Sequence, residues 1–210
     1  MKSSTLATLM AGCISLTAFA ADNKLTASEL DQARVYLQQS RNGVVGATKG
    51  LSEAQWTFKP APDRWSIAEI VEHVILAQEL ILGPIREELA KAPAASTDRD
   101  YKQVDALVVS KIPDRLTKFP APEFLRPTGR WTPAEAMDRL MKDYAQLTEY
   151  LESTPDLRQH RVDAPPLKAV SNGKYESMDG YQWVLAAAAH AERHTKQILE
   201  VKADPNFPAK

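Results

Sequence analysis

One stretch near the C-terminus decides the fold of this chain: Trp183-Val-Leu-Ala-Ala-Ala-Ala-His190-Ala-Glu-Arg-His194-Thr-Lys-Gln-Ile-Leu-Glu-Val201. It contains no glycine or proline and is rich in alanine and leucine, so it is predicted to be a helix. His190 and His194 are four residues apart, which places them on one helical face, one turn above the other. Apolar residues share that face: Trp183, Ala187, Ile198 and Val201. Both histidines are therefore expected to point inward.

Buried histidines need partners. An imidazole has a donor and an acceptor nitrogen, and leaving one of them buried without a partner costs about 1–3 kcal/mol. His190 and His194 must either find separate hydrogen bonds in the core or bind one metal ion together. His73 is a third histidine on an apolar face, in line with Ile70, Ala77 and Leu80 of an upstream helix. A bundle places such faces opposite each other, so three of the four histidines are predicted to meet, which favours the metal.

Four segments show the periodicity and the end signals of long helices. Ser66 with Glu69, and Thr132 with Glu135, are predicted capping boxes. Gly83-Pro84 is predicted to interrupt the second helix, because a proline ring clashes with the carbonyl four residues earlier. The expected segments are residues 28–49 with Ser28 as N-cap, 66–91, 132–153, and a last helix capped by Ser177 or Asp179.

The connecting segments are rich in proline. Pro60 and Pro62 are expected to keep residues 51–64 out of a helix. Residues 92–130 form a long connector with one short helix expected near residues 104–111, and so long a segment is typical of a functional or a disordered region. Its basic residues either contact an anionic substrate or are solvated: Arg115, Lys118 and Arg126.

No alternating strand pattern occurs in the sequence. The predicted class is therefore all-α, as a four-helix bundle with a long crossover connection between helices 2 and 3. His160 follows the third helix in a polar loop, and it is interpreted as a surface residue.

The first twenty residues have the pattern of a secretory signal peptide. Lys2 precedes an almost uncharged apolar run, and Ala18-Phe19-Ala20 fits the cleavage rule, so cleavage is expected after Ala20. The run is shorter than the roughly 20 residues of a membrane span. Cys13 lies in a segment that resembles a lipoprotein box, but mostly apolar residues follow it, which disfavours lipidation. The expected location is periplasmic or secreted, with residues 21–210 as one domain.

Composition limits the partners of the mature chain. The whole chain of 210 residues carries a net charge of −1, and loss of Lys2 changes it to −2. This balance argues against nucleic acid as a partner. Cleavage also removes Cys13, the only cysteine, so the fold must rest on core packing rather than on disulfides. The sequence leaves the assembly open, with a homodimer as one alternative.

Two motifs and the connector resemble a known family. Trp65-Ser-Ile-Ala-Glu-Ile-Val-Glu-His73 resembles the second-helix motif of the DinB-like (damage-inducible, YfiT-like) metalloenzyme superfamily, and His190-Ala-Glu-Arg-His194-Thr-Lys-Gln197-Ile resembles its last-helix motif. The proline-rich segment 113–127 is similar to a connector of many members. The resemblance covers about residues 24–208. It implies that His73, His190 and His194 bind a divalent metal ion.

The resemblance also suggests a reaction class. Some cytoplasmic members are transferases that use thiols such as bacillithiol or mycothiol, and the secretory leader is a departure from them. Three neutral imidazoles leave a fourth coordination position open, as in catalytic zinc sites. Zinc suits this ligand set best, and nickel or iron is also compatible. A zinc-protease motif is excluded because Ala191 and Arg193 stand where its glutamate is required.

The general acid or base is not identified by the sequence. Glu192 is expected to point to solvent, roughly 200° around the helix from the histidines. Glu69 and Glu72 are candidates, although Glu69 is better explained as a capping residue. Two hypotheses follow: a secreted metal-dependent hydrolase or thiol transferase with an unidentified small-molecule substrate, or a non-catalytic bundle that binds a metal or small ligand.

Overall fold

The computed structural model describes residues 24–96, 99–116 and 118–209, so the expected signal peptide and Cys13 lie outside the described residues. The described chain is largely helical, which confirms the all-α class. Its helices and strands are α1 (Ala27–Thr48), α2 (Glu53–Thr57), α3 (Ile67–Leu80), the π-helical turn η1 (Ile81–Ile85), α4 (Arg86–Lys91), α5 (Tyr101–Lys111), the 3₁₀ turn η2 (Glu123–Leu125), α6 (Pro133–Ser153), β1 (Arg161–Asp163), α7 (Pro165–Val170), β2 (Ser177–Asp179) and α8 (Gly180–Lys202).

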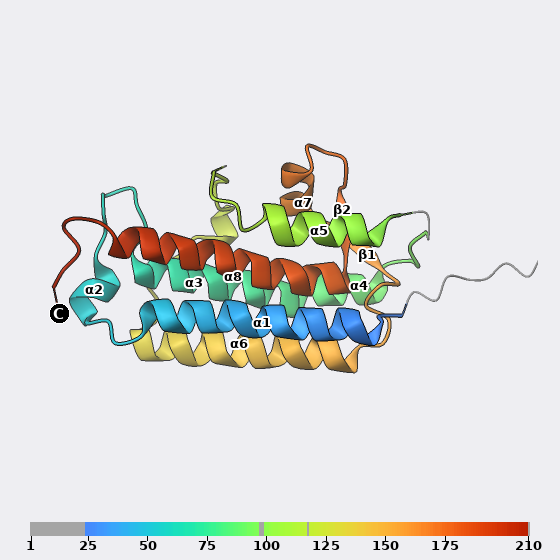
Figure 1. The fold of residues 1–210 in the computed structure, drawn as a ribbon, viewed down its shortest axis with the longest axis horizontal. Coiled ribbons are helices and arrows are strands. Elements are labelled where there is room, and N and C mark those ends of the chain that lie inside the picture. Colours follow the sequence, from blue (N-terminus) through green and yellow to red (C-terminus); the bar gives the residue numbers. More distant parts are fainter. Residues whose placement is uncertain (1–23, 97–98, 117, 210) are drawn as a thin grey trace, which may run out of the picture.

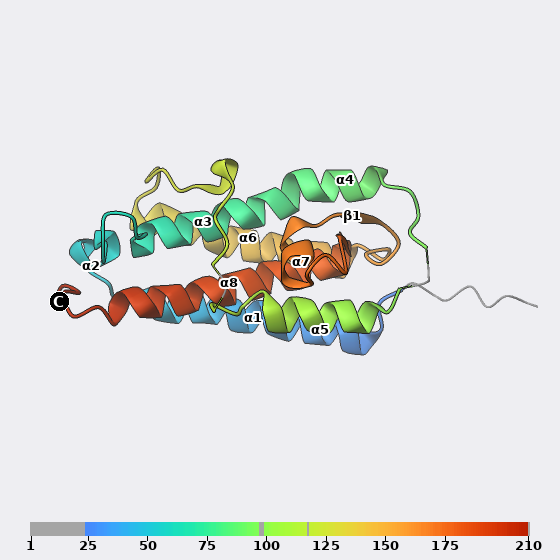
Figure 2. The ribbon, with the colours of Figure 1, turned by 90° about the horizontal axis from the view of Figure 1, so that it is seen from above.

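The long helices α1, α3, α6 and α8 run side by side along the long axis of the molecule (Figure 1). Helix α1 packs against α8 and α6, and α3 packs against the same two helices. Helix α5 belongs to the connector and lies along α8 (Figure 2). The buried apolar faces of the four long helices therefore meet in one shared core.

Hydrogen bonds confirm most of the predicted helix starts. The side chains of Ser66 and Thr132 accept the backbone N–H of Glu69 and Glu135, and both glutamates bond back to the cap residue. Of the two candidates for α8, Asp179 is the N-cap. The prediction for α1 was wrong. Thr26 forms its capping box with Glu29, so α1 begins one residue before Ser28.

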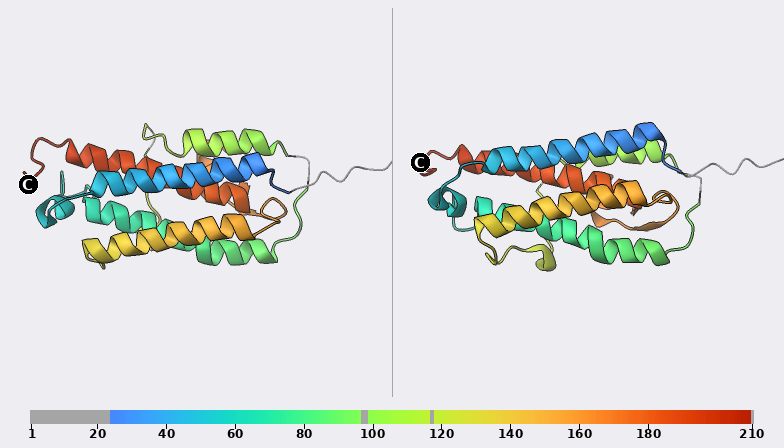
Figure 3. Two further views of the ribbon diagram at one scale, coloured as in Figure 1. Left: turned by 60° about the horizontal axis from the view of Figure 1, so that its bottom comes forward. Right: turned by 90° about the horizontal axis from the view of Figure 1, so that it is seen from below.

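Pro84 interrupts the second helix as predicted. Proline has no N–H to donate, and its ring would clash with the carbonyl of Leu80. The chain accommodates it in the π-helical turn η1, which joins α3 to α4. The two views of Figure 3 show α4 continuing in the direction of α3. The proline thus widens the helix locally without separating its halves.

Three short features differ from the sequence predictions. Helix α2 forms ahead of Pro60, in a segment expected to be non-helical. Strands β1 and β2 pair antiparallel over three residues each, too few to leave a period-two pattern. His160 is half-buried rather than a plain surface residue, because its Nδ1 lies 2.7 Å from the carbonyl oxygen of Ala92.

None of the helices in the described ranges combines the length and apolar character needed to cross a membrane.

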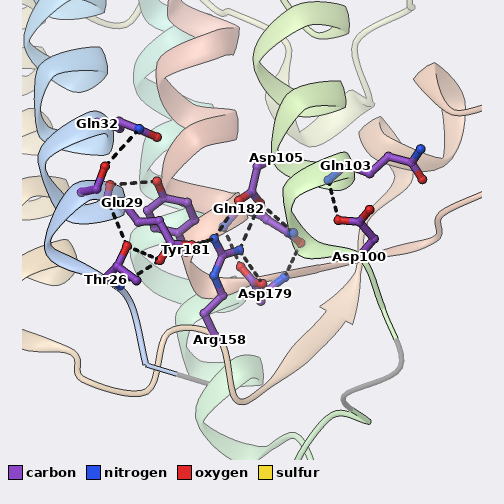
Figure 4. A network of polar contacts seen from close by, with 11 residues as sticks. Thr26, Glu29, Gln32, Asp100, Gln103, Asp105, Arg158, Asp179, Tyr181 and Gln182 are labelled. Carbon is purple, nitrogen blue, oxygen red and sulfur yellow. Dashed lines mark hydrogen bonds and ion pairs between the residues drawn. The ribbon is translucent and has the colours of Figure 1, made fainter. Parts of the chain in front are cut away.

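An ionic cluster around the buried Arg158 joins three helices (Figure 4). Its guanidinium lies 2.6 Å from Glu29 of α1, 2.7 Å from Asp105 of α5 and 3.1 Å from Asp179, the N-cap of α8. It also stacks over the ring of Tyr181, 4.2 Å from the ring centre. Since only 3% of Arg158 is exposed, this cluster fixes the connector helix and the turn before β1 onto the core.

Asp143 of α6 is buried, and its Oδ2 has no hydrogen-bond partner among the described residues. Burial, together with repulsion from Glu79, raises the pKa of Asp143 from 3.8 to about 7. The buried Asp143 carboxyl therefore lowers the free energy of unfolding most when it is ionised, above pH 7. This destabilisation disappears below pH 3.8, where the carboxyl is protonated in both the folded and the unfolded state. Asp143→Asn is expected to raise the free energy of unfolding at pH 8 by about 1–3 kcal/mol.

The increase in the free energy of unfolding caused by Asp143→Asn should shrink as pH falls from 8 to 4, because the Asp143 carboxyl of the wild-type protein becomes protonated and neutral over that range. Urea unfolding of both proteins at several pH values measures this increase. Asp138→Asn is the matched control, since Asp138 lies exposed on the same helix. An equal gain at pH 4 and pH 8 would show that ionisation of Asp143 is not the cause.

Candidate metal centre

The three predicted histidines come together in the core. His73 extends from α3, whereas His190 and His194 extend from consecutive turns of α8. The Nε2 atom of His190 lies 3.2 Å from Nε2 of His73 and 3.0 Å from Nε2 of His194. One ligand nitrogen from each histidine lies within 4.8 Å of the other two. The predicted meeting of the two apolar helix faces is thus confirmed.

Outer hydrogen bonds set the tautomers of two of the histidines. His73 Nδ1 lies 2.8 Å from the carbonyl oxygen of Leu125, and His194 Nδ1 lies 2.8 Å from Oε1 of Gln197. Arg115 donates to the same Gln197 atom at 3.3 Å, which supports its assignment as the oxygen. Because both partners can only accept, each Nδ1 carries the proton. In the neutral rings, Nε2 is then an unprotonated acceptor.

Two lone pairs therefore converge on His190. The Nε2 atoms of His73 and His194 are both acceptors, and a single N–H on His190 Nε2 can satisfy only one of them. The other acceptor is left without a donor within this trio. A divalent cation would satisfy all three nitrogens at once. Zinc–nitrogen bonds of 2.0–2.1 Å place two ligands of a tetrahedral site about 3.3 Å apart, close to the 3.0 and 3.2 Å observed.

The surroundings keep the three imidazoles neutral. Burial lowers the pKa of His73 below 6.5, although its bond to Leu125 works in the opposite direction. The pKa values of His190 and His194 lie well below 6.5, first because of burial and then because the neighbouring histidines would repel a second charge. All three rings are therefore unprotonated at Nε2 or able to become so at pH 7, which is the form that binds metal.

The three histidines differ in their exposure to solvent. His73 and His194 are 5% and 6% exposed, whereas His190 is half-buried. The ring of Trp65 lies 4.8 Å from the His73 ring and 6.5 Å from the His194 ring. His190 is therefore the most exposed residue of the three.

The candidate acid–base residues are engaged elsewhere. Glu69 accepts from the backbone N–H of Ser66, as the capping interpretation predicted, and from Lys59. Glu72 is buried and bonds to the connector at residues 128–130. Glu192, which was expected to point to solvent, has a side chain that is 38% exposed; it pairs with Lys196 at 2.8 Å and accepts a hydrogen bond from Tyr36 of α1 at 2.8 Å. In the part of the chain that the structure describes, the candidate ligand group contains histidines alone.

The connector contributes positioning contacts that the sequence did not reveal. Arg115 forms an ion pair with Glu200 at 2.7 Å and Arg126 pairs with Glu123 at 3.0 Å, so both contact the protein itself. The role of Gln197 was also missed. Its spacing of three residues from His194 could have indicated it, because residues three apart are neighbours on a helix.

Comparisons with known proteins give a family match and a relative of low identity. A family model described as the DinB superfamily matches residues 36–198, a range that includes all three histidines. The chain is 25% identical over 155 residues to the uncharacterized protein YuaE of Bacillus subtilis (strain 168), which covers 73% of this chain and 87% of that protein. No solved structure matches the chain.

Proposed function

The chain belongs to the DinB superfamily, and on that premise we propose that it is a metal-dependent enzyme that performs hydrolysis or group transfer on a small molecule. His73, His190 and His194 are the proposed ligands. The observation that carries the proposal is the convergence of two Nε2 lone pairs on the third histidine, which one N–H cannot satisfy. Of the three ligand residues, His190 is the one that is only half-buried, and on this we base the proposed access for a substrate.

A divalent ion held by three neutral imidazoles supplies Lewis acidity at an open coordination position. Zinc is the best match to this ligand set, and nickel or iron is compatible. The residues of the chain hold and orient the ligands. Leu125 and Gln197 keep protons on the Nδ1 atoms of two histidines, and the ring of Trp65 packs beside His73 and His194.

A second candidate function is non-catalytic binding of a metal or small ligand. It is supported by the engagement of Glu69, Glu72 and Glu192 in other contacts. No carboxylate on α3 or α8 is then available near the histidines in the described residues to act as a general base. In this alternative the ion serves to stabilise the fold.

Cobalt substitution separates the two functions. Co²⁺ bound to the apo protein is expected to change its visible absorption spectrum when azide or a small thiol is added, since an open position accepts an exogenous ligand. The spectrum of a closed, purely structural site would not respond to either ligand. Cobalt-loaded protein at pH 7.5, titrated with azide and with a thiol in turn, provides the measurement.

We also propose the wider organisation predicted from the sequence. Helices α1, α3–α4, α6 and α8 form the four-helix bundle, and residues 92–130 form its crossover. The Lys2 to Ala20 pattern supports export to the periplasm or the medium, with residues 21–210 as the mature domain. Exported protein should begin at Ala21, and N-terminal sequencing that found Met1 would contradict this.

A further inference from the structure

Glu72 directly precedes His73 on α3, and its carboxylate accepts hydrogen bonds from residues 128–130 of the connector. Only 3% of Glu72 is exposed. Its Oε1 accepts the backbone N–H of Thr128 at 2.8 Å and Nε–H of Arg130 at 3.0 Å, while Oε2 accepts the backbone N–H of Gly129 at 2.8 Å. Gly129 has φ +73°, a left-handed conformation that suits glycine. The carboxylate thus holds one tight turn of the connector with charge-assisted bonds.

The same connector supplies the partner of His73. The Leu125 carbonyl accepts the Nδ1 proton of His73 at 2.8 Å, and only two residues separate Leu125 from Thr128. Adjacent residues of α3 therefore bind two points of one short loop. If Glu72 released residues 128–130, the Leu125 carbonyl would lose its fixed position, and the His73 proton could move to Nε2.

We propose that Glu72 is a positioning residue for His73, acting through residues 125–130 of the connector to keep the Nε2 lone pair directed at His190 and His194. In this role Glu72 contacts neither the three histidine rings nor a substrate. Its consequence for metal affinity rests on the proposed function, whereas its consequence for the His73 tautomer does not. Outer partners of metal-binding histidines tune both ring orientation and affinity.

Glu72→Gln is the test. Glutamine has one acceptor oxygen, and its NH₂ group would face a backbone N–H of the turn, so it cannot serve both donors. Zinc affinity at pH 7.5, measured by competition with a chelator, is expected to fall by about 10–100-fold. The ¹⁵N chemical shifts of the His73 ring in the apo protein should show proton density moving from Nδ1 to Nε2.

Two variants serve as controls. Glu79→Gln removes the same charge from the same helix, but Glu79 pairs with Arg139 near the surface, so affinity and tautomer should not change. Arg130→Gln keeps both backbone donors to Glu72, and the Arg130 side chain is 45% exposed. The zinc affinity of the Arg130→Gln variant should change by about fivefold at most, because exposed ion pairs are weak. Glu72→Asp keeps the charge on a shorter side chain and takes the place of Glu72→Gln if that variant does not fold.

The two readouts separate this inference from the proposed function. A Glu72 variant that folds, retains wild-type zinc affinity and keeps the His73 proton on Nδ1 would overturn the inference. If wild-type protein binds no divalent metal but the variant still changes the His73 tautomer, the proposed function fails and the positioning role stands. A loss of affinity with an unchanged tautomer would also overturn it, since Glu72 would then act by another route.

Discussion

Replacing His73, His190 or His194 with alanine is expected to remove the metal from natively purified protein. Each ring supplies one of three ligands, and two imidazoles alone hold a divalent ion poorly. Four-ligand zinc sites bind with about 10–16 kcal/mol, so one ligand is worth roughly 3 kcal/mol, or about a hundredfold in affinity. Elemental analysis by mass spectrometry after dialysis against a weak chelator measures the occupancy.

His160→Ala is the matched control for these variants. His160 is the one of the chain's four histidines that lies outside the proposed site, and its Nδ1 contacts Ala92 rather than the other histidines. Its replacement should leave metal content unchanged. If all three core variants kept full occupancy, the histidines would be satisfied core residues and the shared site would not exist.

The ligand set could be predicted from the sequence because it depends on two local patterns. The spacing of His190 and His194 places them on one helical face, and the apolar residues around His73 place it on another. Both faces must be buried, and burial in one core brings them together. The prediction therefore required no knowledge of the connector.

The outer partners could not be predicted in the same way. The Leu125 carbonyl is a backbone group, so its position depends on the path of the connector. Every residue has such a carbonyl, and the residue types therefore do not indicate which one contacts His73. The sequence makes Glu72 a candidate general base only as a carboxylate on the second helix. Its role became visible only when the structure placed Thr128 and Gly129 against its carboxylate. Contacts between segments so far apart in sequence depend on tertiary packing that local patterns do not specify.

Arg158 illustrates the same limit, because nothing in its sequence surroundings indicated a buried ionic centre. Burial opposes its charge, but bonds to Asp105 and attraction to Asp179 raise its pKa further above the usual range. Burial raises the pKa of Asp179 to about 6, although Arg158 acts against that rise. The arginine and its three carboxylates, with Glu29 as the third, thus form one connected group (Figure 4), in which Arg158 and Asp179 are buried and the side chains of Asp105 and Glu29 are 18% and 25% exposed.

Arg158→Ala is accordingly expected to lower the free energy of unfolding by about 3–5 kcal/mol at pH 8, the cost of leaving buried charges without their partner. Arg34→Ala should cost no more than about 1 kcal/mol, because Arg34 and Glu152 form an exposed pair, at 49% and 46% side-chain exposure. Urea unfolding followed by circular dichroism measures both.

The loss in Arg158→Ala should depend on pH with a definite sign. Without the arginine, the pKa of Asp179 should rise above its native value of about 6, so the folded variant binds protons that the unfolded chain, with a pKa near 3.8, has released. A raised pKa makes folding less costly as pH falls. The destabilisation should therefore be largest at pH 8 and shrink toward pH 5. A loss that is below 1 kcal/mol at pH 8, or that grows in acid, would show that the three carboxylates do not rely on Arg158 for compensation.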